Sequence, residues 1–228
     1  MRGSLRAVRR IARLHDATVN DVLLAISAGG LRQLLQHRGE PIQDTTIRIF
    51  VPMTLRHRLR GPQQGNLIAQ MAVPLSLREP EPGHRLRQIA AETTARKARA
   101  RSSLGTLMVG GRLGRQLILA AVMRQRVNAT SASIPGPRRP LFLAGAQVLD
   151  VYPVLPLIAN EPLGVGAVSY AGNLDIGITA DSDAFPDLPV FVEGMRADLL
   201  RLGDASGQPV VLADRPTRAR RMIASDVA

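Results

Sequence analysis

Residues 163–180 read LGVGAVSYAGNLDIGITA. Two runs of apolar and β-branched residues, 163–170 and 174–180, lie on either side of Ala171-Gly172-Asn173. Gly and Asn accept the positive φ angles that tight hairpin turns require. The stretch therefore predicts two antiparallel strands joined by a short turn. The segments before and after this hairpin decide whether it belongs to an all-β fold or to a mixed one.

Helical patterns occur on both sides of the hairpin. Apolar residues recur at every third position from Leu5 to Leu14, which is typical of an amphipathic helix. Thr18 is suited to cap a second helix that runs to about Gln36. Further helices are expected over residues 85–101, 104–127 and 186–202.

Further strands are expected over residues 46–53, 66–73, 129–133 and 141–151. Proline lacks a backbone N–H group. Pro52, Pro74 and the Pro135-Gly136-Pro137 run are therefore expected to end strands. The order of elements predicts an α+β fold with a mixed β-sheet packed with helices over residues 1–203. The polar, Arg-rich residues 204–228 are expected to form a disordered tail.

The composition narrows the class of protein. The chain has 228 residues, is 45% hydrophobic and contains no Cys, which excludes disulfides, thiolate metal sites and Cys nucleophiles. No apolar run approaches the roughly 18 residues of a membrane-spanning helix, and the Arg-rich start lacks the apolar core of a signal peptide. We therefore expect a cytoplasmic protein.

The charge is positive and uneven. The formal net charge is +12, and residues 1–139 carry 24 basic but only 7 acidic side chains. A basic surface can bind an anionic ligand, a membrane surface or nucleic acid. The arginines follow helical patterns and have no neighbouring aromatic residues on which bases could stack. We therefore expect no nucleic-acid partner.

The residues themselves do not compose a complete active site. The four histidines lie apart from one another, and no zinc-protease, nucleophile-elbow or phosphate-loop motif occurs. Asp181, Asp183 and Asp187 lack the loop Gly and the terminal Glu of a calcium loop. We expect neither a metal ion nor a bound cofactor.

Several local patterns become informative when they are taken in order. They are Asn20-Asp21 at a helix start, Val51-Pro52-Met53, Gly65-Asn66, Ser133-Ile134-Pro135-Gly136-Pro137, and Ser169-Tyr170 ahead of Ile176-Gly177. In this order and spacing, residues 10–203 resemble the C-terminal half of the bacterial wax ester synthase/diacylglycerol acyltransferase family. That family belongs to the CoA-dependent acyltransferase superfamily, so the resemblance implies one lobe of a two-lobed fold like that of chloramphenicol acetyltransferase.

The resemblance also implies roles for particular residues. The family's catalytic motif, H-H-x-x-x-D-G, lies in its N-terminal lobe and has no match here. Asn20 and Asp21 match a family pair that either caps a helix or supports catalysis. The family has Ser-Asn where this chain has Ala132-Ser133, so Ser131 or Ser133 is the candidate to support the reacting carbonyl. The residues expected to line the substrate channel are Pro135, Gly136, Pro137, Ser169 and Tyr170.

Two further groups complete the expected site. Arg56, Arg58 and Arg60 are candidates to bind the phosphates of CoA. Gly65 and Asn66 form a structural motif of the family.

The resemblance implies the C-terminal domain of a long-chain acyl-CoA-dependent O-acyltransferase that makes wax esters or triacylglycerol. Acyl-CoA would then be a substrate, and the other substrate a lipid alcohol. Such a lobe is expected to be inactive without its general base, and to bind a complementary N-terminal lobe or itself. The alternative is a non-enzymatic interaction module that binds a partner lobe, a lipid or a membrane surface. Either function allows peripheral contact with membranes or lipid bodies.

Overall fold

The structure of the chain, a computed structural model, describes residues 1–54, 68–103, 127–157, 161–207 and 209–212. Within these ranges the largest sheet has six strands in the order β1-β8-β7-β4-β2-β3. The strand β4 pairs in parallel with β2 and β7, and all other neighbours in this sheet are antiparallel. The predicted α+β class with a mixed sheet is therefore confirmed. The strands are β1 (Arg2–Ser4), β2 (Thr46–Thr54), β3 (Ile68–Ser76), β4 (Ala129–Pro135), β7 (Leu163–Tyr170) and β8 (Asn173–Ala180).

The hairpin predicted over residues 163–180 is present as β7 and β8. Its loop has two residues, Ala171 with φ of 44° and Gly172 with φ of 87°, because Asn173 already pairs with Tyr170. Two successive positive φ angles match the twist of the flanking strands. The short strand β1, which the sequence patterns did not indicate, extends the sheet beyond β8.

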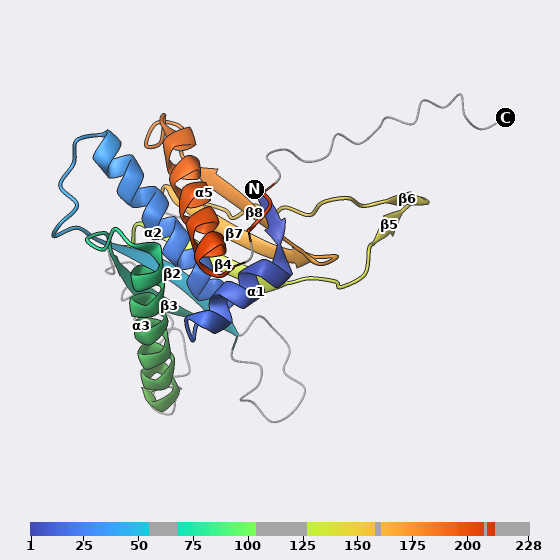
Figure 1. Ribbon diagram of the computed structural model, residues 1–228, viewed down its shortest axis with the longest axis horizontal. Coiled ribbons are helices and arrows are strands. Elements are labelled where there is room, and N and C mark those ends of the chain that lie inside the picture. The colour runs from blue at the N-terminus through green and yellow to red at the C-terminus, as the bar shows by residue number, and fades with distance from the viewer. Residues whose placement is uncertain (55–67, 104–126, 158–160, 208, 213–228) are drawn as a thin grey trace, which may run out of the picture.

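The predicted helices are also confirmed where the structure describes them. They are α1 (Leu5–Leu14), α2 (Val19–His37), α3 (Pro82–Ser103) and α5 (Leu188–Ala205). The first helix matches its prediction, and α5 begins two residues later than expected. The helix expected over 104–127 falls outside the described residues except for its last position. In Figure 1, α2 crosses the sheet and lies between α3 and α5.

The helix α2 is the centre of the helical layer. Thr18 caps it as predicted, since its hydroxyl accepts from the N–H of Asp21 at 3.3 Å and its own N–H donates to the Asp21 carboxylate at 2.8 Å. Farther along, α2 and α5 cross closely. A Cβ atom on Gly30 would lie 2.5 Å from the carbonyl oxygen of Phe191, so this crossing requires glycine. Most of α2 is consequently buried.

Two prolines do not end their strands as expected. Pro52 pairs with Gln70 within β2, and Pro74 pairs with Arg48 within β3. The physical reason is that both sites have a free strand edge: β3 is the last strand of the sheet, and β2 pairs with β4 only at Ile49 and Phe50. A proline on a free strand edge removes no hydrogen bond between strands, because no neighbouring strand would accept from its N–H group.

The prediction of one strand over residues 141–151 is wrong. The segment instead forms two short strands, β5 (Phe142–Leu143) and β6 (Ala146–Gln147), which pair only with each other. Positive φ angles at Ala144 and Gly145 turn the chain back after two residues. Figure 1 shows this segment reaching away from the sheet. We call residues 138–149 the arm.

The chain then returns across the sheet as an extended segment, residues 150–157, which we call the strap. Pro153 and Leu155 of the strap pack directly over glycines of β7 and β8. A Cβ atom on Gly166 would lie 2.8 Å from Cγ of Pro153, and one on Gly177 would overlap the Pro153 carbonyl oxygen. The absent side chains therefore allow the strap to lie against the sheet.

Residues 204–207 and 209–212, in the first part of the segment that was expected to be a disordered tail, are described by the structure. The helix α5 continues to Ala205, and Val210 is buried in the core. Val210 and Leu212 lie over Gly3 of β1, where an added Cβ atom would be 3.3 Å and 3.2 Å from their side chains. The described residues up to Leu212 thus contact the sheet.

Candidate functional site

The structure brings together two motifs that are 33 residues apart. Pro135 at the end of β4 pairs with Ser169 near the end of β7. The N–H of Gly136 donates to Ser169 Oγ at 3.1 Å, and the N–H of Ala171 donates to the carbonyl of Pro137 at 3.0 Å. Pro135–Pro137 and Ser169–Tyr170, which are expected to line one substrate channel, therefore form one assembly at this end of the sheet.

Gly136 is required by this assembly. A Cβ atom at this position would overlap the carbonyl oxygen of Ser169. Two prolines restrict φ on either side of it, so the turn is rigid. A rigid turn at the end of the central strand can hold a neighbouring group at a defined position without further loss of entropy on binding.

Tyr170 anchors the arm. Its side chain is 1% exposed, and its hydroxyl accepts from the N–H of Leu141 at 2.8 Å and donates to the carbonyl of Val148 at 2.7 Å. The N–H of Val148 in turn donates to the carbonyl of Leu141 at 2.8 Å. Tyr170 was predicted to line a channel. That role stays a prediction; in the described residues the Tyr170 hydroxyl holds together the two ends of the segment that contains β5 and β6.

Ser131 and Ser133 lie on the same side of β4, since side chains alternate along a strand. They pair with Val165 and Ala167, which belong to the core beneath the helices. Ser131 is fully buried, and its hydroxyl has no hydrogen-bond partner among the described residues. Ser133 is half-buried. The two candidate hydroxyls therefore face the helical layer.

Asp21 stands at the first turn of α2 and is 2% exposed. One carboxylate oxygen accepts from the N–H and the hydroxyl of Thr18, and the other accepts from the hydroxyl of Thr93 at 2.7 Å. This carboxylate thus connects the start of α2 to α3. The geometry fits the capping role that was one of the two predicted alternatives. Asn20, beside it, is half-buried.

Five predicted site residues fall outside the described ranges. They are the CoA-phosphate candidates Arg56, Arg58 and Arg60 and the motif residues Gly65 and Asn66. Their roles stay predictions.

Several apolar side chains on β4, the arm and the strap are exposed. Ile134 of β4 is 51% exposed, although it belongs to a strand in the middle of the sheet. On the arm, Phe142 is 67% and Leu143 is 75% exposed, and Val154 of the strap is 80% exposed. Adjacent exposed apolar side chains mark interaction surfaces, and the arm carries two that are neighbours in the sequence, Phe142 and Leu143. The expected binding to a complementary N-terminal lobe or to itself requires exposed apolar side chains, and Ile134 is one of them.

A charged cluster that sequence patterns missed holds the strap in place. Arg2 of β1 donates to Asp150 and lies 3.4 Å from Asp175 of β8, while Asp175 accepts from the N–H of Val151 at 3.1 Å. Burial, followed by the nearby charge of Asp175, raises the pKa of Tyr152 in the same strap. No local signal could have indicated this cluster, because its members come from distant parts of the chain.

Neither metal nor membrane features occur where the structure describes the chain. Within those ranges no group of three or more His, Asp or Glu side chains could hold a metal ion. The helices described in the same ranges are too short or too polar to cross a membrane.

Comparison with solved structures shows what the fold is similar to. The fold resembles the wax ester synthase/diacylglycerol acyltransferase from Marinobacter aquaeolei VT8, with a TM-score of 0.69 and 23% identity over 91% of this chain and 48% of that chain. It also resembles the nonribosomal peptide synthetase FmoA3, with a TM-score of 0.63 and 18% identity over 93% of this chain and 22% of that one. The chain therefore has the fold of one lobe of a two-lobed CoA-acyltransferase-type protein.

Sequence comparison identifies the family. The model of the WS/DGAT C-terminal domain matches residues 64–202, and the chain belongs to this family. A probable diacylglycerol O-acyltransferase of Mycobacterium tuberculosis, tgs1, is 32% identical over 87% of this chain. A putative diacylglycerol O-acyltransferase of Mycobacterium bovis shows the same identity over the same share. The chain spans 44% of the length of both relatives.

Proposed function

We propose that this chain is the C-terminal half of a long-chain acyl-CoA-dependent O-acyltransferase that makes wax esters or triacylglycerol. The observation that carries the proposal is the assembly of Pro135–Pro137 with Ser169–Tyr170, next to the exposed side chain of Ile134, within a chain of the WS/DGAT C-terminal domain family. The names of the mycobacterial relatives support diacylglycerol as an acceptor.

In the proposed reaction, the hydroxyl oxygen of a lipid alcohol attacks the thioester carbonyl of acyl-CoA. The new C–O bond forms, the C–S bond breaks, the hydroxyl proton passes to a general base, and CoA leaves as its thiol after that proton is returned. No H-H-x-x-x-D-G motif occurs in these 228 residues. We therefore assign the general base to the half of the relatives that this chain does not span. We assign no cofactor, since acyl-CoA is consumed as a substrate.

For this chain we propose two contributions. The rigid Pro135–Pro137 turn forms part of the channel wall, and the arm together with Ile134 forms the surface on which the complementary half docks. The apolar side chains Phe142 and Leu143 at the end of the arm would become buried in such a complex. Burying a large apolar side chain stabilises a complex by about 1.5–3 kcal/mol. Docking and catalysis are thus coupled, because the general base arrives with the docking partner.

A second candidate function rests on the same surface. Arg138 and Arg139 are exposed and stand directly before the apolar end of the arm. Basic and apolar side chains together favour anionic lipid surfaces. On this alternative the chain is a non-enzymatic module that contacts a partner lobe, a lipid or a membrane surface.

The test is acyl transfer from labelled palmitoyl-CoA to hexadecanol and to dioleoylglycerol. The chain alone should give no ester. The chain mixed with the half of tgs1 that carries the general base should give ester and should co-sediment with that half. The variant Phe142→Asp should abolish both co-sedimentation and turnover, whereas Val211→Asp, at an exposed apolar side chain outside the arm, should leave both unchanged.

Two outcomes would contradict the proposal. Turnover by the chain alone that depends on one of its four histidines would place the base in this chain. Binding to anionic vesicles through the arm, without association or turnover in the presence of the tgs1 half, would favour the interaction module.

A further inference from the structure

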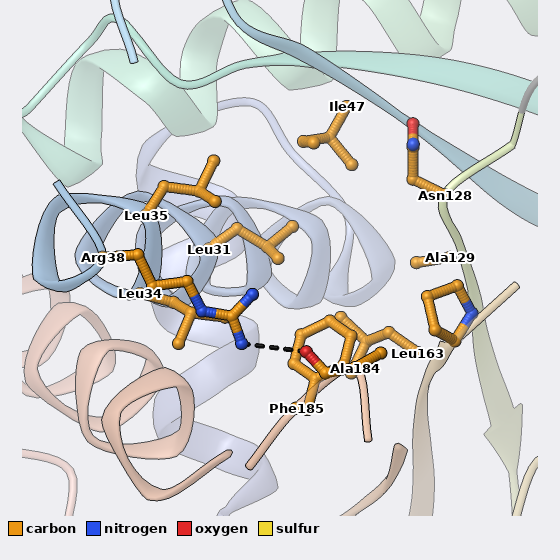
Figure 2. Close-up of a pocket in the computed structure, with 11 residues that line it drawn as sticks. Leu31, Leu34, Leu35, Arg38, Ile47, Asn128, Ala129, Leu163, Ala184 and Phe185 are labelled. Carbon is orange, nitrogen blue, oxygen red and sulfur yellow. Dashed lines mark hydrogen bonds between the residues drawn. The ribbon is translucent and has the colours of Figure 1, made fainter. Parts of the chain in front are cut away.

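A cavity of about 290 Å³ lies at the opposite end of β4 from the Pro135–Pro137 turn. It opens between the last turns of α2 and the first residues of β4 and β7, as Figure 2 shows. Because β4 has seven residues, the cavity and the Pro135–Pro137 turn lie about 20 Å apart. The walls are mainly apolar, formed by Leu31, Leu34, Leu35, Ile47, Leu163 and Phe185.

One lining residue, Arg38, is a cation, and it is exposed to solvent. Arg38, just after α2, lines the cavity with its guanidinium 5.6 Å from the centre of the Phe185 ring. Its Nη2 atom donates to the carbonyl of Ala184 at 2.9 Å, and Nε and Nη2 both donate to the carboxylate of Asp187. In Figure 2 the other terminal nitrogen points away from Ala184 and toward Leu31. The described bonds use Nε and Nη2, and Nη1 lies on the side of the guanidinium that faces Leu31, a residue of the cavity wall.

The cavity also limits what could fill it. Small-molecule pockets range over roughly 300–1,000 Å³, so a volume of about 290 Å³ suits a single short chain. Apart from Arg38, only Asn128 among the lining residues has a polar side chain, and its Oδ1 already accepts from the N–H of Arg48 at 2.9 Å. A ligand that matches these walls is an unbranched alkyl chain with one charged end.

We propose that this cavity binds a medium-chain fatty acid, with its alkyl chain between α2 and the sheet and its carboxylate on Arg38. A carboxylate suits this cation better than a phosphate does. The guanidinium of Arg38 already pairs with the Asp187 carboxylate. A phosphate that carries two negative charges would be repelled by Asp187 more strongly than a fatty-acid carboxylate, which carries one. The inference does not depend on the proposed function, because its test measures binding and not acyl transfer.

The alkyl part of the inference predicts a dependence on chain length. Each methylene group that enters the cavity should tighten binding about fourfold. Affinity should therefore rise through hexanoate, octanoate and decanoate, and then stop rising once the cavity is full. Calorimetry on the whole chain measures the constants, and methyl NMR of Leu31, Ile47 and Leu163 identifies the binding place. Equal affinity for all chain lengths, or no binding at millimolar concentration, would overturn the proposal.

Two variants test whether decanoate binds in this cavity. Ala184→Leu adds side chain at the cavity wall and should weaken decanoate at least tenfold, and Ile47→Phe should do the same from the opposite wall. The matched control is Ala205→Leu, at an exposed position at the end of α5, which should bind like the unchanged chain. Decanoate binding that survives both cavity variants in folded protein would overturn the assigned site.

Two more variants test the head group. Arg38→Gln should weaken decanoate at least about tenfold and leave the neutral decanol unchanged. Asp187→Asn should tighten decanoate, because the guanidinium would no longer be shared with a carboxylate. Hydrogen bonds from Arg38 lower the pKa of Asp187, which shows how closely the two charges are coupled. Equal binding of decanoate and decanol, or tighter binding of decyl phosphate than of decanoate, would overturn the assignment of a carboxylate.

Discussion

Arg85 of α3 and Asp198 of α5 form a buried ion pair that passes directly over Gly29 of α2. The side chains are 1% and 3% exposed. Arg85 Nε also donates to the carbonyl of Ala25 in α2 at 3.1 Å, so one guanidinium joins three helices. A Cβ atom on Gly29 would overlap Asp198 Oδ2 and would lie 2.9 Å from Arg85 Nη2. The ion pair therefore depends on a glycine in the middle of a helix.

We expect Gly29→Ala to lower the free energy of unfolding by about 3–5 kcal/mol. The reason is that the added methyl group must separate a buried ion pair, and breaking such a pair costs about that much. Urea denaturation followed by circular dichroism measures the change. The control is Gly83→Ala in α3, where the nearest atoms belong to the flexible side chains of His15 and Glu81. There the better helix propensity of Ala should raise stability by up to about 1 kcal/mol. A loss at position 29 no larger than 1 kcal/mol would contradict this account.

We expect Arg85→Met to destabilise the fold far more than the same change at Arg96. Removing Arg85 takes one of the two cations that pair with the buried carboxylate of Asp198 in the described residues and leaves Arg201, at 2.5 Å. The cost should be about 3 kcal/mol or more. Arg96 is on the same helix but pairs with Glu92 near the surface, so Arg96→Met should cost less than about 1 kcal/mol. Thermal melts of both variants compare the two sites. Equal losses would mean that burial of the pair does not determine its contribution.

We expect Thr93→Val to lower stability by about 1–3 kcal/mol. This change keeps the shape of the side chain but removes the hydroxyl that donates to the buried Asp21 carboxylate, which is then left with an unpaired oxygen. Thr94→Val is the matched control, because Thr94 is its neighbour on α3 and is exposed. Chemical denaturation of the two variants gives the difference. If both variants have the same free energy of unfolding, Asp21 does not stabilise the contact between α2 and α3.

We expect Tyr170→Phe to loosen the base of the arm. The change removes the hydrogen bonds of the Tyr170 hydroxyl to the N–H of Leu141 and the carbonyl of Val148, and an ordinary hydrogen bond contributes about 0.5–1.5 kcal/mol. Hydrogen exchange in residues 138–149 should become faster. The only other tyrosine of the chain, Tyr152, is half-buried in the strap, and Tyr152→Phe should leave exchange in the arm unchanged. Unchanged exchange in Tyr170→Phe would show that other contacts hold the arm.

We expect His15 to make the fold less stable in acid. Burial, and then the charge of Arg87, lowers the pKa of His15 below 6.5 in the folded chain. Below about pH 6.5 the unfolded chain therefore binds a proton that the folded chain does not, so stability falls as the pH falls through this range. His15→Gln should flatten the dependence of the melting temperature between pH 7 and 5. An unchanged slope would contradict this expectation.

Local patterns in the sequence were sufficient for the elements that depend on near neighbours. The spacing of apolar residues from Leu5 to Leu14 predicted α1, because a helix places every third or fourth residue on one face. Thr18 predicted the start of α2, and Ala171-Gly172 predicted the turn of the hairpin, since capping and tight turns involve only a few consecutive residues. The order of the short motifs was sufficient to predict the family.

Only the tertiary structure decided which strand edges are free and which distant residues meet. Pro52 and Pro74 continue their strands because of where β2 and β3 lie in the sheet. In place of one strand over residues 141–151, the chain forms the β5–β6 pair of the arm and the start of the strap. The Arg85–Asp198 pair joins residues 113 positions apart, and Arg38 meets Phe185 across the cavity. Such contacts depend on how elements pack in space, and packing leaves no periodic signal in the local sequence.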